Sequence, residues 1–104
     1  MADTNEFFNN YLPAKVASNP GLAASINKVF VFDITGAGQW TFDCTNGGSV
    51  SEGDAGNGDC TITIAKGDWE AMLDNPSMAM QLFFTGKLSA SNPPLAMQLQ
   101  KILG

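Results

Sequence analysis

The sequence contains no histidine and no arginine among its 104 residues. Histidine is the commonest general base, so neither a Ser-His-Asp nor a Cys-His catalytic site can be built within this chain. Histidine metal sites are excluded as well, and two cysteines cannot form a structural zinc site alone. Without arginine there is no bidentate clamp for a phosphate group or for guanine. We therefore predict a protein that is not an enzyme and uses no metal or cofactor.

Charged residues are also scarce, at 14% of the chain against roughly 25% in a typical domain. A lightly charged surface leaves room for apolar surface outside the core, as a ligand pocket or a partner face would need. The net charge is −5, so nucleic acid and anionic membrane surfaces repel the chain on average. We expect no nucleic-acid partner and at most transient contact with a membrane.

No apolar run approaches the roughly 18 residues of a membrane span, and the N-terminal segment lacks the apolar region of a secretory signal. Cys44 and Cys60 lie on the predicted inward faces of two strands without CxxC spacing, which favours small buried hydrophobes over a redox pair. They could pair in an oxidising compartment, but a cytoplasmic location with two reduced thiols is the simpler interpretation. The length predicts a single domain over residues 1–104.

The hydrophobic pattern divides the chain into helical ends around a β-rich middle. Residues 4–18 place apolar side chains on one helix face, with Thr4 as the predicted N-cap, and a shorter helix is possible over 22–27. Alternating residues in 30–34, 40–44 and 60–64 predict strands with one apolar and one solvent-facing side, with further short strands at 49–52 and 87–91. Helices are expected over 68–74, after Pro76 and from Pro93 onward. The terminal helices must cover the apolar face of the sheet, which predicts an α+β fold.

Two polar features could be a catalytic site and a calcium site, but both have simpler interpretations. Asp33 and Asp43 lie on the solvent-facing side of one predicted hairpin, where solvated surface acids are far commoner than a catalytic pair. The loop at 52–59 does not fit the helix–loop–helix calcium signature. Counted from Asp54, its third and fifth positions are Gly56 and Gly58, which offer no side-chain oxygen.

Methionines gather in the last third of the chain, among aromatic and aliphatic residues. Met side chains are flexible and polarisable, so they suit surfaces that accept varied apolar shapes. Periodicity alone favours ordinary core packing over a ligand pocket, and composition does not decide between them. These methionines are Met72, Met78, Met80 and Met97.

Several segments form an ordered set across nearly the whole chain: GDCTITI at 58–64, FFTGKL at 83–88 and LAMQLQKIL at 95–103. This set resembles the sterol carrier protein 2 family, and segments 30–34 and 40–43 match its first hairpin in kind. Phe7-Phe8, Leu12-Pro13 and Asn19-Pro20 look like the bacterial-type, stand-alone branch of that family. The chain departs from the family in its acidity, in its lack of arginine and in having no glycine before Asn92.

The resemblance implies an SCP2-like fold, with a five-stranded, mainly antiparallel sheet covered on one face by N- and C-terminal helices. It also implies non-catalytic binding and transport of a fatty acid, a sterol or a similar apolar lipid in a hydrophobic tunnel between the two layers. The alternative is a protein-interaction or accessory module on the same scaffold, without a physiological lipid. We expect a monomer or a weak homodimer in either case.

The predicted lipid pocket takes side chains from both layers. From the sheet we expect Phe32, Trp40, Phe42, Ile62 and Ile64, and from the helices Phe8, Leu12, Trp69, Met72, Met80, Phe84, Met97 and Leu99.

Overall fold

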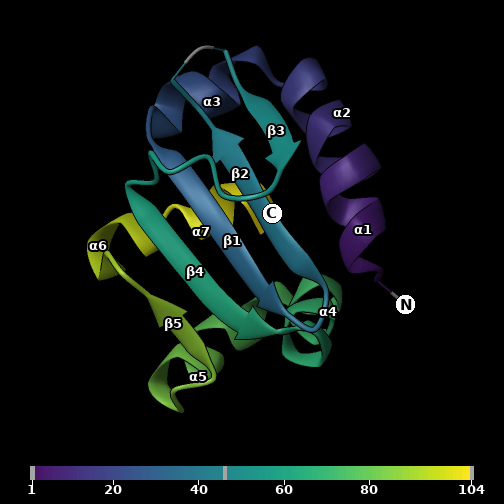
Figure 1. Ribbon diagram of the computed structural model, residues 1–104, viewed down its shortest axis with the longest axis vertical. Coiled ribbons are helices and arrows are strands. Elements are labelled where there is room, and N and C mark those ends of the chain that lie inside the picture. Colours follow the sequence, from purple (N-terminus) through teal and green to yellow (C-terminus); the bar gives the residue numbers. More distant parts are fainter. Residues whose placement is uncertain (1, 46, 104) are drawn as a thin grey trace.

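The computed structural model describes residues 2–45 and 47–103, and it contains one five-stranded sheet with helices packed against one of its faces (Figure 1). The predicted α+β fold is confirmed. The strands are β1 (Val29–Thr35), β2 (Gly38–Asp43), β3 (Ser49–Glu52), β4 (Cys60–Ala65) and β5 (Leu88–Ala90). The helices are α1 (Thr4–Glu6), η1 (Phe7–Tyr11), α2 (Leu12–Ser18), α3 (Pro20–Ile26), α4 (Lys66–Asp74), η2 (Pro76–Met78), α5 (Ala79–Phe84), α6 (Pro93–Ala96) and α7 (Leu99–Leu103). None of the described helices is long and apolar enough to cross a membrane.

The strand order is β3-β2-β1-β4-β5, and every neighbouring pair is antiparallel except β1 and β4, which are parallel. A tight turn joins β1 to β2, with Gly36 at φ 93° and Gly38 at φ 144°, backbone angles that favour glycine. Asp59 fixes the parallel pair at its start, because its carboxylate accepts a hydrogen bond from the Val29 amide at 2.9 Å and its own amide donates to the Val29 carbonyl at 2.8 Å. The sheet is therefore mixed, although most of its pairs are antiparallel.

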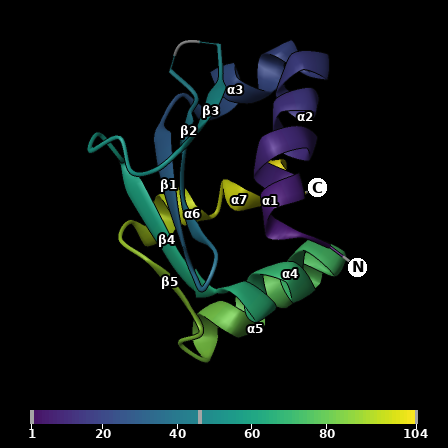
Figure 2. The ribbon, with the colours of Figure 1, turned by 45° about the vertical axis from the view of Figure 1, so that its right-hand side comes forward.

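The two faces of the sheet have different covers. Figure 2 shows α1, α2, α4 and α7 together on one side, where the core lies. On the other side Val31 and Thr41 are buried as well, at 1% and 2% exposure, although the alternation predicts a solvent-facing side there. The connection between β3 and β4 crosses this face: the Thr41 hydroxyl donates to the Gly53 carbonyl at 2.7 Å and accepts from the Ala55 amide. The prediction of a fully solvated face is thus wrong at the centre of that face. The alternation within a strand does not show that a loop from elsewhere in the sequence will cover it.

The N-terminal helix begins one residue earlier than predicted. Asp3, not Thr4, is the N-cap, and its carboxylate accepts a hydrogen bond from the Glu6 amide at 2.9 Å. Thr4 is instead buried, and both its amide and its hydroxyl donate to the Glu70 carboxylate at 2.9 Å. These bonds join the start of α1 to α4.

The C-terminal segment forms two short helices where the sequence predicts one. Around the Met97–Gln98 junction the Gln98 amide donates to the Leu95 carbonyl, and the Lys101 amide to the Gln98 carbonyl, three residues back instead of four. This tighter turn separates α6 from α7. Met97, at this junction, is 59% exposed, while Leu99, the first residue of α7, is turned into the core.

Candidate functional site

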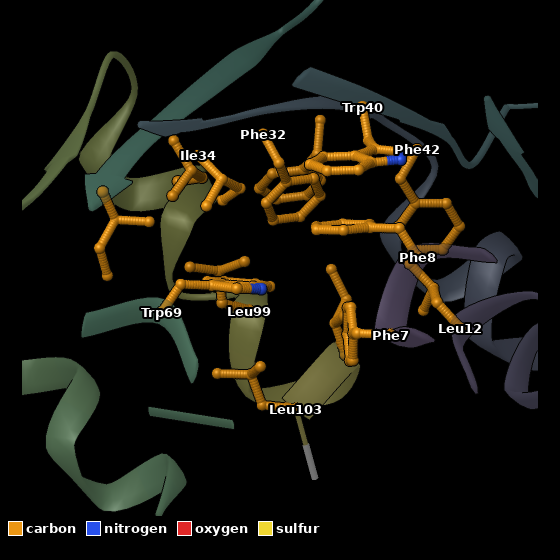
Figure 3. Packing of buried hydrophobic residues seen from close by; sticks show 14 of the residues in the cluster. Phe7, Phe8, Leu12, Phe32, Ile34, Trp40, Phe42, Trp69, Leu99 and Leu103 are labelled. Atoms are coloured by element: carbon orange, nitrogen blue, oxygen red, sulfur yellow. The ribbon is translucent and has the colours of Figure 1, made fainter. Parts of the chain in front are cut away.

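Most of the side chains predicted to line the pocket pack against one another in the core (Figure 3). These ten are at most 4% exposed: Phe8, Leu12, Phe32, Trp40, Phe42, Ile62, Ile64, Trp69, Met72 and Leu99. The space between the sheet and the helices, where the resemblance implies a tunnel, is therefore filled by side chains in this arrangement.

Phe8 is the centre of this packing. Its ring stacks on Trp40, with ring centroids 4.6 Å apart and planes 9° apart, and on Trp69, at 5.5 Å and 7°. Figure 3 shows the Phe8 ring against that of Trp40, with Phe32 beside it. Offset stacking of this kind adds about 0.5–1.5 kcal/mol per pair to the burial of the rings. Phe8 thus holds the two tryptophans together across the layers.

The backbone that carries Phe8 is a π-helical turn, η1, inside an otherwise α-helical segment. The Leu12 amide donates to the Phe7 carbonyl, five residues back. Pro13 follows directly and has no amide hydrogen to continue an α-helical pattern. The wider turn places the adjacent Phe7 and Phe8 both inside, at 6% and 1% exposure. π-helical turns are rare and are found frequently at functional sites.

The indole nitrogens of Trp40 and Trp69 are buried donors without an acceptor in residues 2–45 and 47–103. Leaving such a group unsatisfied costs roughly 1–3 kcal/mol, and most buried polar atoms in proteins do have a partner. Both nitrogens (blue in Figure 3) belong to the aromatic stack around Phe8. The centre of the core therefore contains two hydrogen-bond donors that an oxygen atom would satisfy.

The other three predicted side chains lie outside the core, around a small groove. Met80, Phe84 and Met97 are 44%, 76% and 59% exposed, and they stand at a groove of about 130 Å³ between α5, β5, α6 and α7. Its remaining lining is almost entirely apolar: Ala79, Phe83, Leu88, Pro93, Ala96, Leu99 and Gln100. The sequence prediction missed Phe83 and Leu88, although both belong to the FFTGKL segment that carries the resemblance.

Leu99 connects the groove with the core. It lines the groove and also belongs to the buried cluster, where Figure 3 shows it beside Trp69. The Lys15 ammonium on α2 donates to the Ile102 carbonyl at 3.0 Å and so ties α7 to the N-terminal helices. The Leu99 side chain is accordingly a shared wall between an outer groove and a filled core.

A second hollow, of about 250 Å³, lies between α1, α4 and α7, where Phe7, Tyr11, Leu73 and Leu103 contribute apolar walls. Asp3 and Glu6 also line it. A carboxylate beside an apolar ligand would lose hydration without gaining a partner. The groove has no acidic side chain in its lining, so it is the better candidate for an apolar ligand.

Asp33 and Asp43 do not form a carboxylate pair. Asp33 lies opposite Gln39 and Asp43 opposite Val29 in the β1–β2 register, four residues apart along β1. That separation is about 13 Å at roughly 3.3 Å per residue. Hydrogen bonds from the Thr45 hydroxyl and amide lower the pKa of Asp43, which stabilises a permanently ionised carboxylate. A lowered pKa makes Asp43 poorly suited to proton transfer near neutral pH.

The two thiols are buried and unpaired. Burial, with a smaller contribution from the Asp43 charge, raises the pKa of Cys44 to about 11, and burial also raises the pKa of Cys60. A thiol with a raised pKa is a poor nucleophile and a poor metal ligand. Across the described parts of the chain, no three His, Cys, Asp or Glu residues are grouped in a way that could hold a metal ion.

Comparison with known proteins places these features in a family. The SCP-2 sterol transfer family matches residues 8–104. Sterol carrier protein 2 of Oryctolagus cuniculus is 42% identical to this chain over 65 residues, which cover 61% of this chain and 12% of that protein. Sterol carrier protein 2 of Gallus gallus is 39% identical over 84 residues, which cover 74% of this chain and 15% of that protein. The chain thus spans about an eighth to a seventh of the length of these relatives.

The solved structures that resemble the chain share its fold. Sterol carrier protein 2 from Yarrowia lipolytica in its apo form has a TM-score of 0.73 and 23% identity, covering 95% of this chain and 82% of that one. The structure of palmitated SCP2L2 from Aedes aegypti has a TM-score of 0.71 and 21% identity, covering 94% of this chain and 92% of that one. On its sequence and its fold, this chain belongs to the SCP-2 sterol transfer family.

Proposed function

We propose that the chain is a non-catalytic carrier that binds and transfers a lipid with a long apolar tail. The observation that carries the proposal is the apolar groove rimmed by Met80, Phe84 and Met97, in a chain of the sterol transfer family. The palmitated relative with the same fold supports a fatty acid as the ligand, and a sterol or a similar apolar lipid is the alternative ligand. We place the carrier in the cytoplasm as a single-domain monomer or weak homodimer, without nucleic acid or cofactor.

The size of the groove limits what it can hold alone. Its volume of about 130 Å³ is close to that of a cavity of roughly 150 Å³ that admits benzene, so it takes about six carbons. At about 0.8 kcal/mol per buried methylene, six carbons contribute about 5 kcal/mol, which corresponds to a Kd of a few tenths of a millimolar. A Kd of about 1 µM needs about 8 kcal/mol, or roughly ten methylenes. A carrier with useful affinity must therefore admit the tail beyond the groove.

The core offers a continuation past Leu99. In this proposal the tail moves the Leu99 side chain aside and takes the place of the Phe8 ring between Trp40 and Trp69. The position of Leu99 supports this route, because its side chain lines the groove and also belongs to the buried core cluster. The π-helical turn under Phe8 supports it as well, because such turns are rare and are found frequently at functional sites.

The proposal is tested with freshly purified protein by native mass spectrometry, followed by displacement of a bound fluorescent fatty acid. Met97→Glu introduces a carboxylate at the groove rim and should weaken binding at least tenfold. Tyr11→Glu is the matched control, because Tyr11 is similarly exposed, at 48%, but lies outside the groove. Protein that carries no lipid and shows no displacement, or an equal effect of both variants, would rule the groove out as a lipid site.

The filled core favours one second candidate, an interaction module without a physiological lipid. Lipid-free protein would then recover a protein partner in pull-down experiments, and sedimentation would show the complex. Partner binding that is unchanged in the presence of saturating fatty acid would favour this candidate over the carrier.

A further inference from the structure

We propose that Met80 and Met97 are a paired oxidation site, at which a hydroperoxide converts both thioethers to sulfoxides and so lowers the affinity of the groove for lipid. The inference rests on the proposed function, because it concerns the regulation of the same groove. Met80 belongs to α5 and Met97 directly follows α6, so two separate elements each bring one sulfur atom to a shared lining. One class of reagent can therefore change the groove at two points.

The fold decides which sulfur atoms an oxidant reaches. Met80 and Met97 are 44% and 59% exposed, whereas Met72 is fully buried and Met78 is partly buried against the core. The two thiols are buried as well, and burial raises their pKa values, which disfavours the reactive thiolate. Among the sulfur atoms of the described residues, those at the groove are therefore the first that a hydroperoxide reaches.

The oxidation step needs only the thioether and the hydroperoxide. The sulfur atom attacks the terminal oxygen of the hydroperoxide, so that a sulfur–oxygen bond forms and the oxygen–oxygen bond breaks. Sulfur loses two electrons to the hydroperoxide, whose hydrogen ends on the remaining oxygen as an alcohol, or as water when the oxidant is hydrogen peroxide. Methionine sulfoxide reductases reverse the step, in which two thiols become a disulfide and water is released. Because no general base takes part, a chain without histidine can undergo this chemistry.

A sulfoxide at the groove opposes the binding of an apolar tail. Oxidation turns a flexible apolar side chain into a polar one. Among the described residues that line the groove, Gln100 alone has a polar side chain. A sulfoxide oxygen that the tail separates from water therefore finds at most one side-chain donor, and an unsatisfied polar group is costly to bury. Oxidation of both residues should weaken the affinity for a fatty acid about tenfold or more.

The same modification should leave the fold intact. Met80 and Met97 lie outside the buried cluster, whereas Met72 belongs to it. Changes at exposed positions usually have little effect on stability, while a polar group forced into the core has a large one. Weaker binding at an unchanged denaturation midpoint therefore distinguishes oxidation at the groove from damage to the core.

Mild treatment with tert-butyl hydroperoxide, followed by peptide mass spectrometry, measures the oxidation of each methionine. Met80 and Met97 should be oxidised at least tenfold faster than Met72, which is the internal control. Displacement of a fluorescent fatty acid should then show an affinity at least tenfold weaker, with an unchanged midpoint in urea, and reductases for both sulfoxide epimers should restore it. Oxidation of Met72 at the same rate, or weaker binding only together with a shifted midpoint, would overturn the proposal.

A matched pair of variants tests whether these two sulfur atoms are responsible. The double variant Met80→Leu, Met97→Leu keeps an apolar rim without an oxidisable sulfur, so its affinity should be the same before and after treatment. Met78→Leu should respond to treatment as the native chain does, and an equal response of both variants would contradict the assignment. If untreated protein binds fatty acid and oxidised protein binds it equally well, the oxidation site is wrong and the carrier stands. If untreated protein binds no fatty acid, the carrier fails and the oxidation site fails with it.

Discussion

Replacing Phe8 by alanine should lower the free energy of unfolding by about 4–5 kcal/mol. Removing a buried phenylalanine side chain costs about 3–5 kcal/mol when the cavity does not collapse. Phe8 is 1% exposed and has ring contacts with Phe7, Phe32, Trp40 and Trp69, each of which adds about 0.5–1.5 kcal/mol, so the upper end applies. A domain of this size has a total stability of about 5–15 kcal/mol, so the loss is a large part of it.

Urea denaturation followed by tryptophan fluorescence measures this loss, because both tryptophans contact Phe8 directly. Phe84→Ala is the matched control: the same change at a 76% exposed position should cost less than about 0.5 kcal/mol. Phe8→Leu keeps most of the volume and should fold even if the alanine variant does not. A loss below about 1.5 kcal/mol for Phe8→Ala would refute a filled core, because it would mean that Phe8 borders open space.

Three further outcomes are expected. Leu99→Ala should lower stability by about 2–4 kcal/mol and strengthen binding of a fluorescent fatty acid, since it opens the wall between groove and core; weaker binding would contradict that role. At pH 8 native Cys44 should react with a thiol reagent at least a hundredfold more slowly than in urea, because with a pKa of about 11 only about one Cys44 thiol in a thousand is ionised. Cys60, whose pKa is also raised by burial, should react more slowly in the native protein than in urea. Gly48→Ala should destabilise the fold by about 2 kcal/mol more than Gly47→Ala. Both glycines have positive φ, but only at position 48 would the new Cβ lie 2.7 Å from the Val16 side chain. Equal losses of stability in the two variants would show that this contact relaxes freely.

The elements of the fold could be predicted because their patterns are local. Alternation in β1, β2 and β4 reports which side chains face the core, and the prolines at 76 and 93 mark where helices begin. The parallel pairing of β1 with β4 and the loop over Val31 depend on contacts between segments that are distant in the sequence. Local hydrophobic periodicity does not predict such contacts. The N-cap was misplaced by one residue because Asp3 and Thr4 are both good N-caps, and only the contact with Glu70 distinguishes them.

The candidate site was harder to predict than the fold. We expected Met80, Met97 and Leu99 to line one pocket, because all three are apolar residues of the last third of the chain. The structure separates them: Met80 and Met97 are exposed at the groove, while Leu99 is buried in the core. Phe7 and Phe8 both face the core, as the apolar face of the predicted helix implies, but the pattern does not anticipate the π-helical turn η1 that carries them. The division between groove and core therefore depends on how α5, α6 and α7 pack against the sheet, which composition alone does not show.

Affinity measured over a series of fatty acids of increasing chain length tests most directly whether the groove and the core form one lipid site. If the tail passes Leu99, affinity should keep rising about fourfold per methylene beyond about six carbons and reach a Kd of about 1 µM or tighter. If affinity stops rising at about six carbons, with a Kd of a few tenths of a millimolar, the groove is a closed hollow and the core admits no ligand.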